Sequence, residues 1–133
     1  EEQAQGTCFA AVVEEEASQR YCWLPVNPAK AEPHSLTRAL EPALRFAYSH
    51  LRRGRRLLVH CDTGHNVCVA VAVAVMLRCY SASGLLRAAP FSAALPPREE
   101  AELTKDDVRS RLAGISMHCP EARPSRAMLK QVF

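Results

Sequence analysis

The sequence lacks several features that would place the protein in a membrane, in an oxidising compartment or along a single-stranded nucleic acid. Its longest uninterrupted apolar run, residues 67–77, has eleven residues, which is too short to cross a bilayer as a helix. The six cysteines contain no Cys-x-x-Cys pair and no spacing typical of a metal site, so we expect reduced thiols, no bound metal and a cytoplasmic protein. Aromatic residues make up only 6% of the chain, which argues against a stacking platform for single-stranded RNA.

The length and composition of the chain are those of one folded domain. It has 133 residues, of which 48% are hydrophobic and 23% charged, close to the average of globular proteins. A net charge of +3 does not by itself indicate a nucleic-acid or membrane partner. The chain begins at Glu1 and not at Met, which suggests a processed chain or a piece of a longer one. No basic segment followed by an apolar run, as in a secretory signal peptide, is visible near its start. We therefore expect a single domain over residues 1–133 that forms part of a longer protein.

Hydrophobic patterning alternates between strands and helices along the chain. Short apolar runs predict three strands, at residues 8–13, 21–26 and 56–60. Apolar residues at helical spacing predict four helices, which start near residues 35, 67, 104 and 125. Ser35 is the expected N-cap of the first helix, but Pro42 lies inside its pattern, so this helix should be kinked or begin near Glu41. The alternation predicts an α/β fold with a largely parallel sheet and helices on both of its faces.

The most informative stretch is residues 57–67, where an apolar strand runs into a short loop and then into a buried helix. In a strand, loop and helix of this kind the N–H groups of the loop converge, and the helix N-terminus adds positive potential. Gly64 allows the backbone to turn inward, and a cysteine at this point should have a depressed pKa. We therefore predict a phosphate-binding loop made by Cys61, Asp62, Thr63, Gly64, His65, Asn66 and Val67.

This loop resembles that of the cysteine-dependent protein-tyrosine and dual-specificity phosphatases, in which Cys61 would be the catalytic nucleophile. The phosphatase motif also needs an Arg six residues after the Cys, a Ser or Thr immediately beyond it, and an upstream Asp that protonates the leaving oxygen. Here Val67 takes the Arg position, Cys68 takes the Ser or Thr position, and no Asp precedes Cys61. An active phosphatase is therefore the alternative reading. Cys61 is interpreted as an anion-loop or structural residue, oriented by hydrogen bonds from His60.

Three segments resemble a narrower family, the initiator tRNA ribosyl-phosphate transferases, which end in a phosphatase-like domain. Residues 61–74 resemble the family's loop, Cys-x-Thr-Gly-Lys-Asp-x-Ser-Val-Gly-Val-Ala-x-Ala. Residues 105–112 resemble Lys-Asp-x-Ile-Arg-x-Arg-Leu, and residues 124–129 resemble Pro-Ser-Arg-Ala-x-Leu. The loop departs from the family's pattern at His65, Asn66, Cys68 and Ala70.

The resemblance implies that residues 1–133 form a dual-specificity-phosphatase-like domain in the C-terminal part of a longer enzyme. By resemblance, the full enzyme moves a phosphoribosyl group from phosphoribosyl pyrophosphate onto a ribose 2′-hydroxyl of initiator tRNA. Its transferase site is expected in an N-terminal domain of the same chain. The phosphatase-like domain should then bind phosphate or tRNA without hydrolysis and without a cofactor of its own. A purely structural module that supports the transferase domain is a third reading.

Arginines are the candidates for contact with tRNA. The densest basic cluster flanks Gly54 and consists of Arg52, Arg53, Arg55 and Arg56. It would neutralise RNA phosphates or form a solvated turn. Because this cluster precedes the third strand and the loop follows it, the two should lie at opposite ends of the sheet, about 16 Å apart at the usual rise of a strand. Arg126 is the other candidate, with a salt bridge that fixes the last helix as its alternative role.

Overall fold

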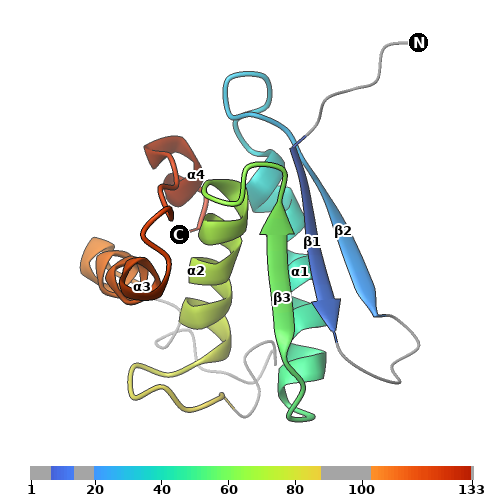
Figure 1. Ribbon diagram of the computed structural model, residues 1–133, viewed down its shortest axis with the longest axis vertical. Helices are drawn as coiled ribbons and strands as arrows, with labels where there is room; N and C mark the ends of the chain where they lie inside the picture. The colour runs from blue at the N-terminus through green and yellow to red at the C-terminus, as the bar shows by residue number, and fades with distance from the viewer. Residues whose placement is uncertain (1–6, 14–19, 88–102, 133) are drawn as a thin grey trace.

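The computed structural model describes residues 7–13, 20–87 and 103–132 (Figure 1). Along the chain the elements are β1 (Thr7–Val13), β2 (Tyr21–Val26), α1 (Ser35–Leu51), β3 (Leu57–Cys61), α2 (Val67–Cys79), α3 (Lys105–His118) and α4 (Arg126–Lys130). Every strand and helix predicted from the sequence is present, with boundaries that agree to within one or two residues.

The three strands form one sheet in the order β2-β1-β3, in which both neighbouring pairs run antiparallel. The prediction of a largely parallel sheet is therefore wrong for the described residues. β2, α1 and β3 do form the expected strand–helix–strand unit, since both strands run antiparallel to β1 and hence in the same direction. However, β1 lies between them and pairs with both, so no parallel ladder forms.

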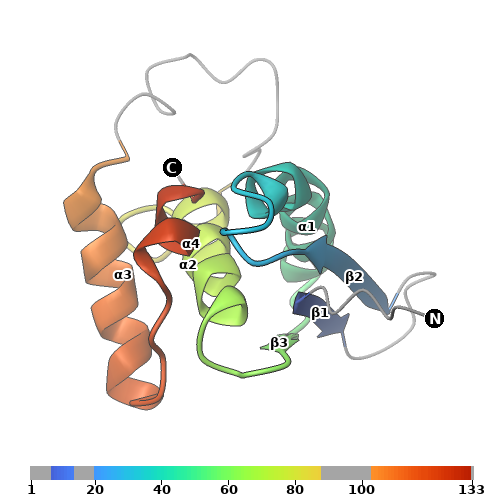
Figure 2. The ribbon, with the colours of Figure 1, turned by 90° about the horizontal axis from the view of Figure 1, so that it is seen from above.

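The described helices lie on one face of this sheet (Figure 2). On β2 the side chains of Leu24 and Val26 are buried toward the helices, whereas Trp23 is 55% exposed on the other face. On β3 Leu58 is likewise 61% exposed. Within the described residues, helices on both faces of the sheet are therefore not found, and that prediction is wrong there.

The core is centred on α2, which packs against α1, α3 and β3. Ten of its thirteen residues are buried, including Val71, Val73 and Ala74, which have no more than 1% of their surface exposed. This confirms the prediction of a buried helix despite the alternating Val residues that resemble a strand. A half-buried strand needs a polar face, and this segment has none before Arg78.

The first helix begins where the sequence predicts but is capped differently. It runs continuously through Pro42, so a start near Glu41 is wrong. His34, rather than Ser35, occupies the N-cap position and its side chain makes no capping bond. Instead, Gln131 supplies the missing acceptor, because its Oε1 accepts hydrogen bonds from the N–H groups of Leu36 (3.0 Å) and Thr37 (3.2 Å). The start of α1 therefore depends on a residue at the far end of the described chain.

The last two helices begin where the sequence predicts, and each has a side-chain cap. Thr104 and Asp107 form a reciprocal capping box, in which the Thr104 hydroxyl accepts from the Asp107 N–H and the Asp107 carboxylate accepts from the Thr104 N–H. These bonds hold the pKa of Asp107 below its usual value. Ser125 caps α4 by accepting a hydrogen bond from the N–H of Met128 (3.2 Å). None of the helices in the described part of the chain is long and apolar enough to cross a membrane.

Candidate functional site

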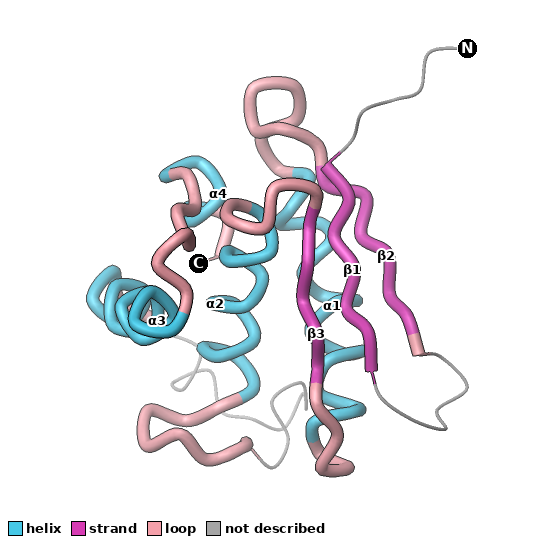
Figure 3. Tube along the Cα trace, in the orientation of Figure 1, coloured by secondary structure: helices cyan, strands magenta, loops and turns pink. Residues whose placement is uncertain are grey.

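The predicted loop connects the end of β3 to the start of α2 and lies beside the segment that leads into α4 (Figure 3). β3 fixes its first residue, because Cys61 is the last residue of the strand and pairs with Phe9 of β1. The buried first turn of α2 fixes its other end, since Val67 is only 1% exposed. The five residues between these two anchors are free of regular structure and curl around the Cys61 sulfur.

Hydrogen-bond donors converge on the Cys61 sulfur. The Gly64 N–H donates to Sγ at 3.3 Å, and the Thr63 hydroxyl lies 3.7 Å from it. The backbone N–H and the thiol of Cys68 also bond to this sulfur. Burial alone would raise the pKa of Cys61, but these bonds outweigh it and lower the pKa to about 7. The loop therefore stabilises a negative charge at its centre, as the sequence predicts.

Cys68 is the protonated partner of Cys61 in the hydrogen bond between the two side chains. Burial raises its pKa to about 12, and the hydrogen bond to Cys61 together with the charge of the Cys61 thiolate adds to the shift. At neutral pH the Cys68 thiol is therefore protonated, and its S–H donates a hydrogen bond to the Cys61 sulfur. Cys68 thus places a hydrogen-bond donor at the position where the phosphatase motif has its Ser or Thr.

Gly64 gives the loop its inward turn. Its φ of 72° lies in the left-handed region, which residues with a side chain seldom adopt. No atom lies within 4 Å of the position that a Cβ would take at Gly64. The requirement for glycine here therefore comes from the backbone conformation and not from a lack of space.

The remaining predicted loop residues differ in what they can offer an anion. The Asp62 carboxylate accepts the Thr63 N–H at 2.8 Å, so this side chain stabilises the turn and brings a negative charge. His65 is exposed, and its Nδ1 lies 3.2 Å from the Thr63 carbonyl oxygen. The side chain of Val67 is buried in the core, so this residue can present only its backbone. The loop can therefore offer an anion its backbone N–H groups, the Thr63 hydroxyl, the His65 ring and the Asn66 side-chain NH2 group.

The loop is tied to the segment before α4 by two hydrogen bonds. The Ser125 N–H donates to Asn66 Oδ1, and the Arg123 N–H donates to the His65 carbonyl oxygen, each at 2.8 Å. Nothing in the local sequence pattern predicts these contacts, because Asn66 and Ser125 are 59 residues apart. They fix the backbone of the loop from outside the strand–loop–helix unit.

We expect that replacing Asn66 by Ala destabilises the fold by about 1 kcal/mol, the usual net contribution of one hydrogen bond. The Ser125 N–H would lose its acceptor, and the loop would lose one of its two ties. Urea unfolding monitored by circular dichroism measures this change. Asn66→Asp is the matched control, because it keeps an oxygen acceptor at the same position. An equal loss of stability in both variants would contradict the role assigned to this contact.

The structure places the predicted basic residues in two separate regions. Arg52 and Arg53 are exposed at the end of α1, and the loop lies at the other end of β3, as predicted (Figure 1). Arg55 turns back onto buried His50, with 3.1 Å between its guanidinium and the ring Nδ1. Arg126 is exposed in α4 and makes no ion pair with another described residue, so the salt-bridge alternative has no support in that part of the chain.

The predicted contact between His60 and Cys61 is wrong. His60 was predicted to orient Cys61 through hydrogen bonds, but it is exposed on the face of β3 opposite to Cys61, because successive residues of a strand point to opposite faces.

The cysteines whose side chains the structure describes are free thiols, namely Cys22, Cys61, Cys68, Cys79 and Cys119. Among the described residues, no three His, Cys, Asp or Glu side chains come close enough together to hold a metal ion.

Comparison with known proteins gives a family-level match. The family model described as the Rit1 DUSP-like domain matches residues 20–133, which include β2, the loop, and the two segments that contain α3 and α4. No curated protein and no solved structure gives a significant match to the chain.

Proposed function

Because the chain belongs to the family of Rit1 DUSP-like domains, we propose that it binds phosphate groups of initiator tRNA without hydrolysing them. The observation that carries this proposal is the geometry around Cys61. Donors from Gly64 and Cys68 converge on the Cys61 sulfur, but Val67, at the position where a phosphatase has its Arg, is buried in the core. The loop therefore has hydrogen-bond donors that stabilise a negative charge, but it lacks the Arg that binds the transferred phosphoryl group in a phosphatase.

The domain would act as the accessory part of an initiator tRNA phosphoribosyl transferase. In this proposal the transferase site, which uses phosphoribosyl pyrophosphate as its substrate, lies in an N-terminal domain of the same chain. The phosphatase-like domain works in the cytoplasm and needs no cofactor. Its ligand is the tRNA backbone or the ribosyl phosphate already attached to it.

Two missing groups explain why hydrolysis should be negligible. A general acid contributes about 10²–10⁴-fold to a rate, and no Asp precedes Cys61 to protonate a leaving oxygen. A donor aimed at the transition-state charge contributes about another 10²–10³-fold, and the buried Val67 cannot act as one. If the Cys61 thiolate attacked a phosphate ester, the P–O bond would have to break as the S–P bond forms, and the leaving oxygen would depart slowly because no general acid protonates it.

The test is to measure binding of the 133-residue chain to initiator tRNA with and without the 2′-O-ribosyl phosphate, at low and high salt. We expect tighter binding to the modified tRNA and loss of this preference in Gly64→Val, because the variant cannot easily hold φ at 72°. Gly84→Val is the matched control, since Gly84 also has a positive φ (84°) and open space around it, but lies beyond α2. A preference that survives in Gly64→Val would contradict the proposal.

The other outcomes point to the alternative readings. Equal binding to both tRNAs that disappears when Arg52, Arg53, Arg55 and Arg56 are neutralised would show a backbone clamp at the other end of β3. Absence of binding to either tRNA would leave only the structural module. In that case, deletion of the domain from the full enzyme should lower its stability.

A second candidate function, a divergent cysteine-dependent phosphatase, is favoured by one observation. The Cys61 pKa of about 7 means that about half of this thiol is deprotonated and nucleophilic at neutral pH. This reading predicts release of phosphate from an aryl phosphate ester, its loss in Cys61→Ser, and a trapped phosphocysteine. We expect no Cys61-dependent release.

A further inference from the structure

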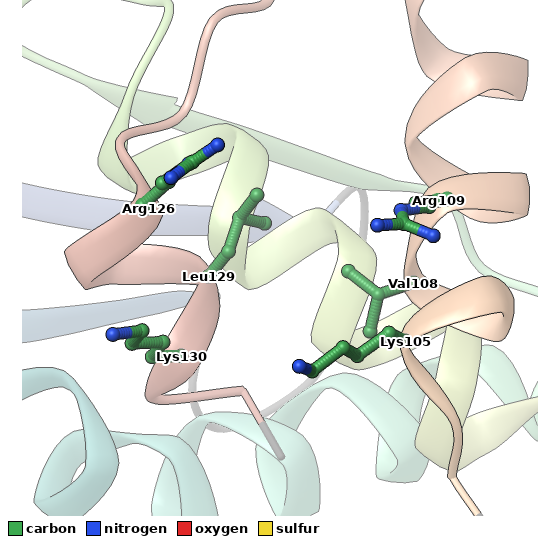
Figure 4. A pocket seen from close by; sticks show the side chains of 6 residues that line it. All are labelled: Lys105, Val108, Arg109, Arg126, Leu129 and Lys130. Atoms are coloured by element: carbon green, nitrogen blue, oxygen red, sulfur yellow. The ribbon is translucent and has the colours of Figure 1, made fainter.

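A pocket between α3 and α4 is bordered by cationic side chains that the loop does not use (Figure 4). It has a volume of about 440 Å³. Its lining residues are Lys105, Val108 and Arg109 of α3 and Arg126, Leu129 and Lys130 of α4. Four of these six residues carry a positive charge, and the other two are apolar.

The helical period explains why the charges gather here. On each helix two cations stand four residues apart and therefore share one face, as Lys105 and Arg109 do on α3. An apolar residue lies between the two cations of each helix and faces the protein interior. Val108 of α3 is buried in the core, and Leu129 of α4 packs against the core. Both helices pack beside α2, and Lys105, Arg109 and Arg126 extend into the space between them, whereas the Lys130 ammonium points away from α3 (Figure 4). The result is an apolar floor with a cationic rim.

Three of the four cations of this rim have no ionic partner within the described part of the chain. No carboxylate lines the pocket, and Lys105, Arg126 and Lys130 make no ion pair with another described residue. Arg109 contacts Asp106 at 3.0 Å, but both side chains are strongly exposed, and such pairs contribute little. Like charges grouped around one opening repel each other, and an anionic ligand would relieve this repulsion.

The pocket lies next to the anion loop. α4 begins directly after Ser125, whose N–H is bonded to Asn66 of the loop. A ligand that reaches from the loop across the start of α4 would therefore meet Arg126 first and then the rest of the rim. A ligand with one phosphate could occupy only one of these regions, whereas a chain of phosphates could occupy both.

We propose that this pocket binds the sugar–phosphate backbone of the tRNA strand that continues from the loop. Cations on two helices suit successive phosphates better than one isolated phosphate, for which donors would converge on a point. The apolar floor of Val108 and Leu129 gives a ribose a surface to pack on. This inference rests on the proposed function, because it takes tRNA as the ligand, and it adds Lys105, Arg109 and Lys130 to its contacts.

Lysine footprinting tests the proposal without any substitution. The chain has three lysines, of which Lys105 and Lys130 line the pocket and Lys30 is exposed between β2 and α1. An acetylating reagent should modify Lys105 and Lys130 at least threefold more slowly in the presence of initiator tRNA, with Lys30 unchanged. Equal protection of all three lysines, or protection of none, would overturn the proposal.

A charge-matched pair of variants gives the second test. Arg126→Ala with Lys130→Ala removes two pocket cations, and the control Arg20→Ala with Arg45→Ala removes two exposed cations that do not line the pocket. The pocket variant should bind initiator tRNA about tenfold or more weakly. Its slope of log affinity against log salt should be smaller by about 1.4 to 1.8, the value for two lost phosphate contacts. The same loss in the control, or no loss in the pocket variant, would refute the assignment.

Comparison with Gly64→Val separates this proposal from the proposed function. If only Gly64→Val changes tRNA binding, the pocket proposal fails and the loop function stands. If only the pocket variant weakens binding, equally for modified and unmodified tRNA, the loop function fails and the pocket stands. Pyrophosphate or an acidic peptide that protects the two lysines as well as tRNA does would show a general anion site and overturn the RNA assignment.

Discussion

Cys61 should react with iodoacetamide at pH 7 about a hundredfold or more faster than Cys68 or Cys79. With a pKa of about 7, about half of Cys61 is thiolate at this pH. Burial raises the pKa of Cys68 to about 12 and that of Cys79 to about 11, so only about 10⁻⁵ and 10⁻⁴ of these thiols are ionised. Timed alkylation followed by peptide mass spectrometry measures the three rates in one sample.

The expected ratio is smaller than the ratio of thiolate fractions for a physical reason. A thiolate of low pKa is intrinsically less nucleophilic, with a Brønsted coefficient of about 0.4–0.5. Over five pKa units this removes about two orders of magnitude from the advantage of Cys61 over Cys68. Burial of Cys68 and Cys79 slows their reaction further and restores part of the difference. The rate for Cys61 should rise with pH and reach half its maximum near pH 7.

Substitutions of Cys68 identify the source of the low pKa. Cys68→Ala removes a hydrogen bond to the Cys61 sulfur, so the midpoint of the Cys61 alkylation profile should move upward. Cys68→Ser keeps a donor at the same position and should keep the midpoint near 7. If Cys61 in the unaltered chain titrates at the usual value for a free thiol, the description of this loop as an anion cradle is wrong.

Replacing Gln131 by Leu should destabilise the protein by about 2–3 kcal/mol, because it combines the loss of a helix cap with two N–H groups left without an acceptor. Gln131 is 6% exposed, and its Oε1 accepts from Leu36 and Thr37 at the start of α1. Leu has a similar volume, so the effect should come from the lost acceptor and not from a cavity. Urea unfolding should show a midpoint about 1 M or more lower.

The control for this prediction is Gln131→Glu. The carboxylate keeps the acceptor for Leu36 and Thr37 and places a negative charge at a helix N-terminus, where it is favourable, but it loses the 3.3 Å bond to the Ala127 carbonyl oxygen. It should cost clearly less stability than Leu. Unchanged unfolding of Gln131→Leu would mean that water or another group caps α1.

Local signals in the sequence were sufficient for the helices and strands. The predicted helix start near residue 104 is where the Thr104–Asp107 capping box lies, and the unbroken apolar run after Asn66 predicted a buried helix. The order of the strands could not be predicted in this way. The insertion of β1 between β2 and β3 depends on pairings such as Phe9 with Cys61, which join residues far apart in the chain.

In the candidate site, too, local features could be predicted from the sequence and long-range contacts could not. The strand, loop and helix around Cys61 could be found from sequence, because all their parts are local. Asn66 and Ser125 are 59 residues apart, and Leu36 and Gln131 are 95 apart, so no periodicity indicates these contacts. Arg126 was selected from a motif, but Lys105 and Lys130 joined it only once the pocket between α3 and α4 was known.

These long-range contacts also determine when the domain can be finished during synthesis. A chain emerges from the ribosome from its N-terminus, so α1 and the loop emerge well before residues 123–131. Until then α1 lacks its cap and the loop lacks both of its ties to Arg123 and Ser125. The segment that completes the fold also carries Arg126 and Lys130. A nascent chain therefore gains the two outer ties of its loop, the cap of α1 and its cationic pocket in the same late step.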